Sequence, residues 1–146
     1  YTTDASGLAA TRSQLEDPKA HIILPEIISK EPLGPVVRHG DNQWGDLVRW
    51  TLNAMIIAEE LGVTSENVDE MKNSKNPEIQ RLLGVSGEYG EMLGLSKDWA
   101  YNVIKAIGNY GESFDRHLGP DTAIGLERGL NALWSKGGIL YAPPFR

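Results

Sequence analysis

Hydrophobic positions recur every three or four residues along much of the chain after residue 40. The longest run lies between Asp41 and Leu61, and its apolar positions are Trp44, Leu47, Val48, Leu52, Met55 and Ala58. This spacing is that of one face of an α-helix. Asp41 stands where a helix N-cap belongs, and Gly62 stands where a left-handed C-cap belongs. The pattern therefore predicts a long amphipathic helix over 41–61.

Shorter helices are predicted beyond Gly62. Asn76, Pro77 and Glu78 supply a cap, a first-turn proline and a first-turn acid, and Gly84 ends that helix. Another helix opens at Ser96 or Asp98, and its apolar stripe is Trp99, Val103, Ala106, Ile107, Tyr110 and Phe114. A last helix is expected to carry Leu126, Leu130, Leu133 and Trp134 and to end at Lys136-Gly137-Gly138. We expect the helices to pack as one unit through Leu47, Val48, Met55, Trp99, Ile107, Leu130 and Trp134.

Strand-like patterns are confined to the first forty residues. Tyr1, Thr2 and Thr3 are strand formers, and residues 21–25 read as a short buried strand that ends at a proline. Residues 30–38 carry two prolines and a glycine, which favours an extended connector or an edge strand. The pattern predicts an α/β fold, mostly helical with a few strands. So few strands cannot complete a sheet without others.

Composition excludes several classes of function. Lys and Arg number 14 against 20 Asp and Glu, a net charge of −6, which argues against a nucleic-acid partner or an anionic membrane surface. The absence of cysteine excludes disulfides, thiolate metal ligands and thiol nucleophiles. No apolar run approaches the ~20 residues of a membrane span. With 40% hydrophobic and 23% charged residues, the composition is that of a soluble globular protein.

The sequence contains no clear catalytic or metal-binding motif. Residues 111–115 place a serine near a glycine, but the G-x-S-x-G elbow needs a second glycine where Asp115 stands. The histidines are isolated from one another, at His21, His39 and His117, and residues 84–90 match neither a dinucleotide-binding loop nor a P-loop. We therefore expect no catalytic residue, no metal site and no cofactor.

Other conspicuous side chains have structural interpretations. Acidic pairs such as Glu59-Glu60 are adjacent in sequence, so they are expected on a solvated helix face. The tryptophans fall on or beside apolar stripes, at Trp44, Trp50, Trp99 and Trp134. Packing in the core or between lobes is the favoured interpretation for them over a ligand platform.

Asp4 is the one candidate for a binding residue. It separates the strand formers 1–3 from a predicted helix that contains Ala5, Leu8, Ala9 and Ala10. As an N-cap, its carboxylate would accept hydrogen bonds from the first helical turn. As a binding group, it would lie at the carboxyl end of a strand, the edge where open α/β sheets hold ligands. The residues alone leave both interpretations open, with the cap the commoner one.

Four segments carry a resemblance to a known family. They are YTTDASGLAA at the start, ILPEIISKEPLGPVVRHGDNQWGDLVRWTLNAMIIAEELGVT, IKAIGNYGESFDRHLG, and RGLNALWSKGGILYAPPFR at the end. Together they resemble the C-terminal part of the periplasmic solute-binding proteins of bacterial amino-acid ABC transporters, and most of all the general L-amino-acid-binding branch. The resemblance covers essentially the whole chain.

The resemblance implies an organisation. Proteins of this family have two lobes of the periplasmic-binding-protein type II fold, which close around one amino acid and deliver it to an inner-membrane permease. Residues 1–29 then correspond to the end of the second lobe, and residues 30–38 to the hinge crossover strand. Residues 39–146 correspond to the C-terminal helical part packed on the first lobe. A missing N-terminal segment of the same protein would complete both lobes.

The resemblance favours the binding interpretation of Asp4 over the cap interpretation. Asp4 matches the family's aspartate that binds the α-ammonium group of the ligand, a charge-assisted hydrogen bond in a site that excludes water. The family's arginine for the ligand carboxylate would belong to segments upstream of Tyr1. We therefore expect an L-amino-acid-binding protein of the periplasm, without catalysis. The alternative is an enzyme of the same two-lobed fold whose catalytic groups lie in the missing half.

Overall fold

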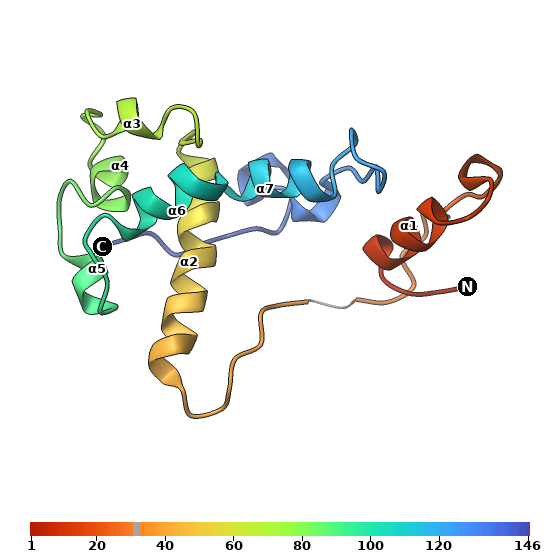
Figure 1. Ribbon diagram of the computed structural model, residues 1–146, viewed down its shortest axis with the longest axis horizontal. Helices are drawn as coiled ribbons and strands as arrows, with labels where there is room; N and C mark the ends of the chain where they lie inside the picture. The colour runs from red at the N-terminus through yellow and green to blue at the C-terminus, as the bar shows by residue number, and fades with distance from the viewer. Residues whose placement is uncertain (31–32) are drawn as a thin grey trace. The chain divides into compact units, whose positions relative to one another are not determined.

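The structure is a computed structural model that describes residues 1–30 and 33–146, and the regular secondary structure of the described part is helical (Figure 1). The α-helices are α1 (Ala5–Ser13), α2 (Asn42–Glu60), α3 (Val68–Met71), α4 (Pro77–Leu82), α5 (Tyr89–Met92), α6 (Trp99–Ile107) and α7 (Tyr110–His117). Three short 3₁₀ turns are η1 (Pro18–Ala20), η2 (Gly129–Asn131) and η3 (Trp134–Lys136).

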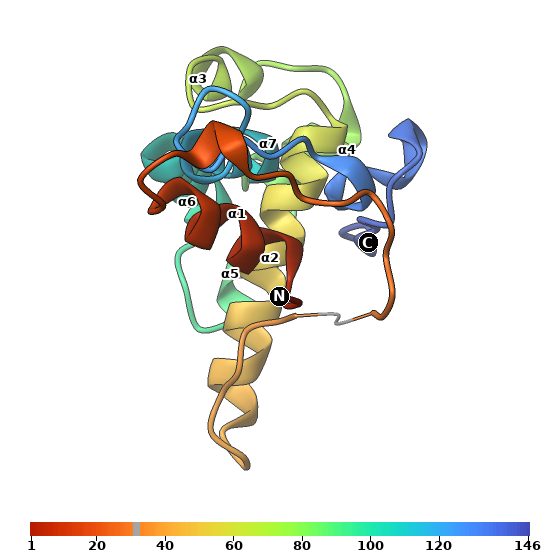
Figure 2. The ribbon, with the colours of Figure 1, turned by 90° about the vertical axis from the view of Figure 1, so that its right-hand side faces the viewer.

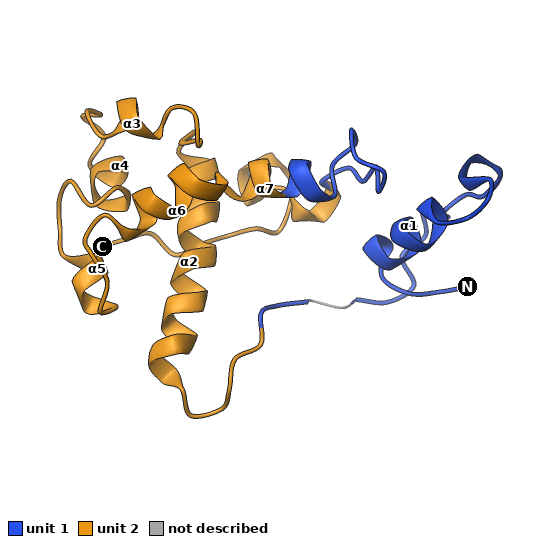
Figure 3. Ribbon diagram, in the orientation of Figure 1, with its two compact units in different colours: residues 1–35, 114–128 blue, residues 36–113, 129–146 orange. Residues whose placement is uncertain are grey.

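The chain divides into two compact units, each composed of two stretches of sequence (Figure 3). Unit 1 contains residues 1–35 and 114–128, and unit 2 contains residues 36–113 and 129–146. The division falls within α7, between Ser113 and Phe114. The helical stretch 39–146 expected from the sequence therefore contributes residues 114–128 to unit 1.

The long helix predicted over 41–61 is confirmed as α2. Asp41 is its N-cap, and the Asp41 carboxylate accepts a hydrogen bond of 3.2 Å from the backbone N–H of Trp44. At the other end Gly62 has φ of +69°, and the N–H of Val63 bonds to the carbonyl of Ala58 at 2.8 Å. This is the Schellman motif, in which glycine adopts the left-handed conformation at little cost in free energy. The caps read from the sequence therefore set both ends of the helix.

The core of unit 2 forms where α2 meets its neighbours. α2 packs against α4 and α6, and α3 packs against α6, as the two orthogonal views show (Figures 1 and 2). The buried side chains include Ala54, Ile56, Ile57, Ala58, Val63, Val68, Leu82, Leu83, Ala100, Ile104 and Leu133. Unit 2 therefore has one continuous apolar core, organised around the second half of α2.

The last residues of the chain close this core. The ring of Phe145 is buried and lies against Trp50 at 5.3 Å, Tyr89 at 5.6 Å and Trp99 at 6.2 Å between ring centroids. Arg81 on α4 donates a hydrogen bond of 2.9 Å from Nε to the carbonyl of Phe145. The segment thus contacts α2, α4, α5 and α6 at a single residue.

A polar cluster joins the start of α7 to the loop after α2. The side chain of Asn109 accepts from the N–H of Glu112 at 3.0 Å, and the Glu112 carboxylate accepts from the N–H of Asn109 at 2.8 Å. This reciprocal pair is a capping box. The same carboxylate accepts from the N–H and the hydroxyl of Ser65, and Asn109 donates to the carbonyl of Val63. The Glu112 carboxylate therefore binds two segments that are far apart in sequence.

Unit 1 is smaller, and its helices are α1, η1 and the end of α7. Ala9 on α1 is buried, whereas large apolar side chains of the following segment are exposed, namely Ile22, Leu24, Ile27, Ile28 and Leu33. In the second stretch, the guanidinium of Arg128 lies 5.2 Å from the ring centre of Phe114. The N–H of Leu126 bonds to the carbonyl of Leu118 at 2.8 Å.

The strands expected at residues 1–3 and 21–25 are wrong, because these residues form no β-ladder in the described structure. Residues 30 and 33–38 form no ladder either, so the edge strand is absent there, and the extended connector that the prolines also favour stays a prediction. Glu31 and Pro32 of this segment lie outside the described residues. Local propensity extends the backbone, as at His21 with φ of −120° and ψ of 138°, but a strand exists only when another strand pairs with it. Within the described part of the chain, the β-bridge that is present joins Leu133 to Leu140.

Two helix predictions need correction. Gly108, with φ of +82°, separates α6 from α7, so the stripe 99–114 belongs to two helices, and Ala106 and Ile107 are exposed. Residues 126–138 form two 3₁₀ turns in place of a last α-helix, because the carbonyl of Ala132 and the N–H of Trp134, on either side of Leu133, bond to the backbone of Leu140 instead of continuing a helix.

The expected packing residues are confirmed only in part. Met55 and Trp99 belong to the core, whereas Leu130 and Trp134 are exposed.

The burial difference between two leucines predicts a stability difference. Leu82 is 1% exposed and Leu130 is 55% exposed. Leu82→Ala should lower the free energy of unfolding by about 2 to 5 kcal/mol, because it leaves a cavity in the core. Leu130→Ala, the matched control, should change it by less than about 0.5 kcal/mol. Urea titration of both variants measures the difference, and equal losses would contradict the packing described here.

A second prediction concerns the polar cluster. Glu112→Ala removes the acceptor for the N–H groups of Ser65 and Asn109, so it should cost about 1 to 3 kcal/mol of stability. Glu66→Ala, at an exposed acidic position, should cost less than about 0.5 kcal/mol. Thermal unfolding of the two variants is the measurement. A Glu112→Ala protein as stable as Glu66→Ala would mean that this cluster contributes nothing.

Candidate functional site

Asp4 is at the N-cap position of α1, as the sequence predicts. Its backbone carbonyl accepts the first helical hydrogen bond, from the N–H of Leu8 at 2.9 Å. Its φ and ψ of −55° and 152° place the residue outside the helix, but its carboxylate makes no capping hydrogen bond with the first turn. The cap interpretation of this side chain is therefore wrong, although the position is correct. Asp4 is half-buried, and its carboxylate makes no capping hydrogen bond with α1.

Thr3 lies beside the first turn of α1. The side chain of Thr3 folds over this turn, and a Cβ at Gly7 would lie 3.1 Å from the Thr3 methyl group. Gly7 therefore leaves room for Thr3 beside the helix. A carboxylate at the start of a helix is also favoured by the helix dipole without a direct bond.

A second cluster of charged groups joins α3 to α6. Asp69 accepts hydrogen bonds from the hydroxyl of Tyr101 at 2.7 Å and from Nζ of Lys105 at 2.6 Å. The hydrogen bond from Lys105 lowers the pKa of Asp69, with Tyr101 contributing in the same direction, and the bond to Asp69 raises the pKa of Lys105. Asp69 and Lys105 are open to solvent, and neither lines a cavity described here. The cluster is therefore an exposed link between helices.

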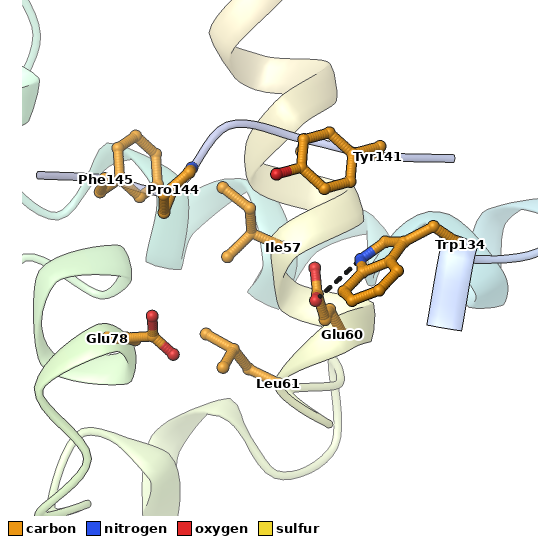
Figure 4. Close-up of a pocket in the computed structure, with 9 residues that line it drawn as sticks. Ile57, Glu60, Leu61, Glu78, Trp134, Tyr141, Pro144 and Phe145 are labelled. Atoms are coloured by element: carbon orange, nitrogen blue, oxygen red, sulfur yellow. Dashed lines mark hydrogen bonds between the residues drawn. The ribbon is translucent and has the colours of Figure 1, made fainter. Parts of the chain in front are cut away.

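A hollow of about 200 Å³ lies in unit 2 between α2, α4 and the last residues of the chain (Figure 4). Its lining residues are Ile57, Glu60, Leu61, Glu78, Trp134, Tyr141, Ala142, Pro144 and Phe145. Trp134 Nε1 donates a hydrogen bond of 3.1 Å to Oε1 of Glu60. In Figure 4 the carboxylate of Glu78 approaches from the side opposite Trp134.

Sequence reasoning missed this hollow. Glu60 lies on the exposed face of α2 as expected, but the sequence does not indicate that Trp134 would bind it. The two residues are 74 positions apart, and no short motif joins them. The capping box of residues 109–112, by contrast, has a local signal, because an N-cap residue three positions before a glutamate is its signature.

The described residues contain neither a metal-binding group of side chains nor a membrane-spanning helix. Within residues 1–30 and 33–146, no three or more His, Cys, Asp or Glu side chains are grouped so as to hold a metal ion. No helix in these ranges is both long and apolar enough to cross a membrane.

Comparison with known proteins gives several relatives along the whole chain. It is 62% identical to the general L-amino acid-binding periplasmic protein AapJ of Rhizobium johnstonii, over 100% of this chain and 43% of that protein. It is 59% identical to the glutamate/glutamine/aspartate/asparagine-binding protein BztA of Rhodobacter capsulatus, over 100% of this chain and 44% of that protein. The chain thus spans less than half the length of these relatives. No family model matches the chain.

A solved structure shows the same fold. It is an ABC transporter periplasmic binding protein from Brucella ovis with glutathione bound, 54% identical, with a TM-score of 0.96 over 100% of this chain and 46% of that one. The putative amino-acid ABC transporter-binding protein YhdW of Escherichia coli is 53% identical over 99% of this chain and 42% of its own length. These findings confirm the resemblance seen in the sequence: along its whole length the chain is similar to part of the periplasmic amino-acid-binding proteins of ABC transporters, and it spans less than half of each.

Proposed function

We propose that this chain is part of the substrate-binding component of an ABC transporter for L-amino acids. The observation that carries the proposal is the identity of 62% and 59%, along the whole chain, to proteins named for binding amino acids. Such a component works by equilibrium binding, so capture and release of the ligand are its activity and no bond of the ligand is made or broken. Its place of action would be the periplasm, and its partner would be the inner-membrane permease.

Asp4 is the proposed anchor for the α-ammonium group of the ligand. Two features of the fold support this role: the carboxylate lies at the start of α1, and the helix does not use it as a cap. A half-buried carboxylate pairs strongly with an ammonium group when closure of the site excludes water. The ligand's α-carboxylate would be bound by residues outside this chain.

The ligand class follows from chemistry that the relatives' ligands share. One relative is named for glutamate, glutamine, aspartate and asparagine, and the Brucella structure contains glutathione. The γ-glutamyl residue of glutathione keeps its α-ammonium and α-carboxylate groups on one carbon, as glutamate does. A site that binds this head group and leaves space beyond the side chain would accept both. We propose that the ligands carry such a glutamyl or aspartyl head group.

The proposed organisation is that of a two-lobed type II binding protein. Residues 1–29 would belong to the second lobe, residues 30–38 would be the hinge crossover, and residues 39–146 would pack on the first lobe. The missing N-terminal segment of the same protein would cover the exposed apolar side chains of residues 21–36 and pair with the extended segments. Exposed apolar side chains in such number are otherwise costly in water.

The alternative, an enzyme of the same fold, has less support. Its catalytic groups would all have to come from outside the chain, and the relatives compared here are named as binding proteins. Mixing the intact protein with its best amino acid distinguishes the two, because a binding protein gains thermal stability and returns the ligand unchanged. Conversion of the ligand would favour the enzyme.

The role of Asp4 gives a direct prediction. Asp4→Asn in the intact protein should weaken binding of L-glutamate about a hundredfold to several thousandfold, which corresponds to the ~3 to 5 kcal/mol lost when one partner of a buried ion pair is removed. The melting temperature without ligand should change little, since the carboxylate makes no capping hydrogen bond and only its interaction with the helix dipole, about 0.3 to 1 kcal/mol, is lost. Asp17→Asn, an exposed aspartate of the same unit, is the control and should leave affinity unchanged. Calorimetric titration measures both. Unchanged affinity in Asp4→Asn would refute the assignment.

The shared head group gives another prediction. Glutathione and L-glutamate should compete for one site, and Asp4→Asn should weaken both by a similar factor. Cysteinylglycine, which lacks the γ-glutamyl residue, should not compete. Competition calorimetry tests this. Simultaneous binding of glutathione and glutamate, or glutathione binding that is indifferent to Asp4→Asn, would show that the head group is not what this site recognises.

A further inference from the structure

Gly7 is a glycine that the backbone conformation of α1 does not require. It is the third residue of the helix, and its φ is not among the positive values that favour glycine. Glycine at a helical position lowers stability relative to alanine, because it loses more conformational freedom on folding. A residue that weakens its own helix in this way has its reason elsewhere, and local departures of this kind are expected at functional sites. The space that Gly7 leaves is therefore the feature to explain.

The side chain of Thr3 occupies that space. A Cβ at Gly7 would lie 3.1 Å from the methyl carbon of Thr3 and 3.5 Å from its hydroxyl oxygen. The first distance is shorter than a favourable contact between two carbon atoms, about 3.5 to 4.0 Å, so a methyl group at position 7 would displace Thr3. Because the two residues are four positions apart, their contact is formed within this chain alone.

Thr3 immediately precedes Asp4, the proposed anchor for the ligand. The backbone of Asp4 is held from both sides, because Thr3 lies against the first turn and the Asp4 carbonyl accepts a hydrogen bond of 2.9 Å from the N–H of Leu8. The Asp4 carboxylate accepts no hydrogen bond from this turn. Glycine at the third helical position also has no side chain with which to close a capping box. The carboxylate thus stays uncapped at a position where aspartate ordinarily caps.

An uncapped carboxylate is an advantage for binding an ammonium group. A carboxylate that caps a helix has to give up its hydrogen bond before it pairs with a ligand, and a typical N-cap bond corresponds to a factor of about five in an equilibrium constant. A group that is already free does not carry this cost. We propose that Gly7 is a positioning residue for ligand binding, which gives Thr3 its place on the first turn and so keeps the Asp4 carboxylate available to the α-ammonium group. This inference rests on the role proposed above for Asp4.

Substitution of Gly7 tests the proposal in the intact protein, with L-glutamate as the probe. Gly7→Ala should raise the Kd about two- to tenfold, because displacement of Thr3 lets the Asp4 carboxylate cap α1. The melting temperature without ligand should not fall, since alanine favours the helix and the new cap stabilises it. Calorimetric titration and thermal unfolding measure the two effects. A lower melting temperature with an unchanged Kd would mean that Gly7 has a structural role alone.

Thr3→Ser provides a rescue. Serine keeps the hydroxyl group and lacks the methyl group that a Cβ at position 7 would meet, so Gly7→Ala should leave the Kd unchanged in the Thr3→Ser protein. Thr3→Ser alone should change the Kd less than about twofold. Gly45→Ala is the matched control, because Gly45 lies near the start of α2 and a Cβ there would meet a Val37 methyl group at 3.5 Å, an ordinary contact. It should leave the Kd unchanged.

Asp4→Asn separates this inference from the role proposed for Asp4. If Asp4→Asn weakens binding and Gly7→Ala does not, the positioning role is refuted while the anchor stands. If Asp4→Asn leaves the affinity unchanged, the anchor fails and the positioning role fails with it. In the Asp4→Asn protein, Gly7→Ala should weaken binding no further, because no carboxylate remains to be positioned. A loss of affinity that persists in the Thr3→Ser protein, or that Gly45→Ala reproduces, would also overturn the proposal.

Discussion

Burial of one aromatic ring near the end of the chain organises unit 2. Phe145 lies among Trp50, Tyr89 and Trp99, and Arg81 holds its carbonyl, so four helices meet at one residue. Each aromatic pair contributes about 0.5 to 1.5 kcal/mol beyond the burial of area. The same anchor positions the neighbouring residues 141–144, which form one wall of the hollow. Core stability and the shape of the hollow therefore depend on the same contact.

Features set by neighbouring residues could be predicted from the sequence. The ends of α2 and α4 are fixed by Asp41, Asn76 and the glycines that follow the helices, all within a turn of the element they end. Features set by distant pairing could not be predicted. The segments read as strands have no partner among the described residues, and residues 126–138 fold back on Leu140 instead of continuing as a helix. Propensity decides an element only when its hydrogen bonds are local.

The candidate sites differ in the same way. The position of Asp4 at a helix start could be predicted, but the absence of a capping hydrogen bond from its carboxylate could not, because Asp is a common N-cap residue. The hollow requires residues of α2, α4 and the end of the chain together, and the sequence places them in separate patterns. The sequence alone therefore predicts a solvated helix face for its acidic residues. It predicts an apolar helix stripe for its aromatic residues.

The discontinuity of both units has a consequence for biosynthesis. A ribosome releases residues 1–35 long before residues 114–128, so unit 1 has to wait for the whole of 36–113 to be made. The helices of 36–113 can collapse earlier, but their aromatic faces stay uncovered until Phe145 emerges. A nascent chain that stalls shortly before residue 145 would expose apolar surface that chaperones and proteases recognise. The core of unit 2 would thus be completed only after residue 145 has emerged.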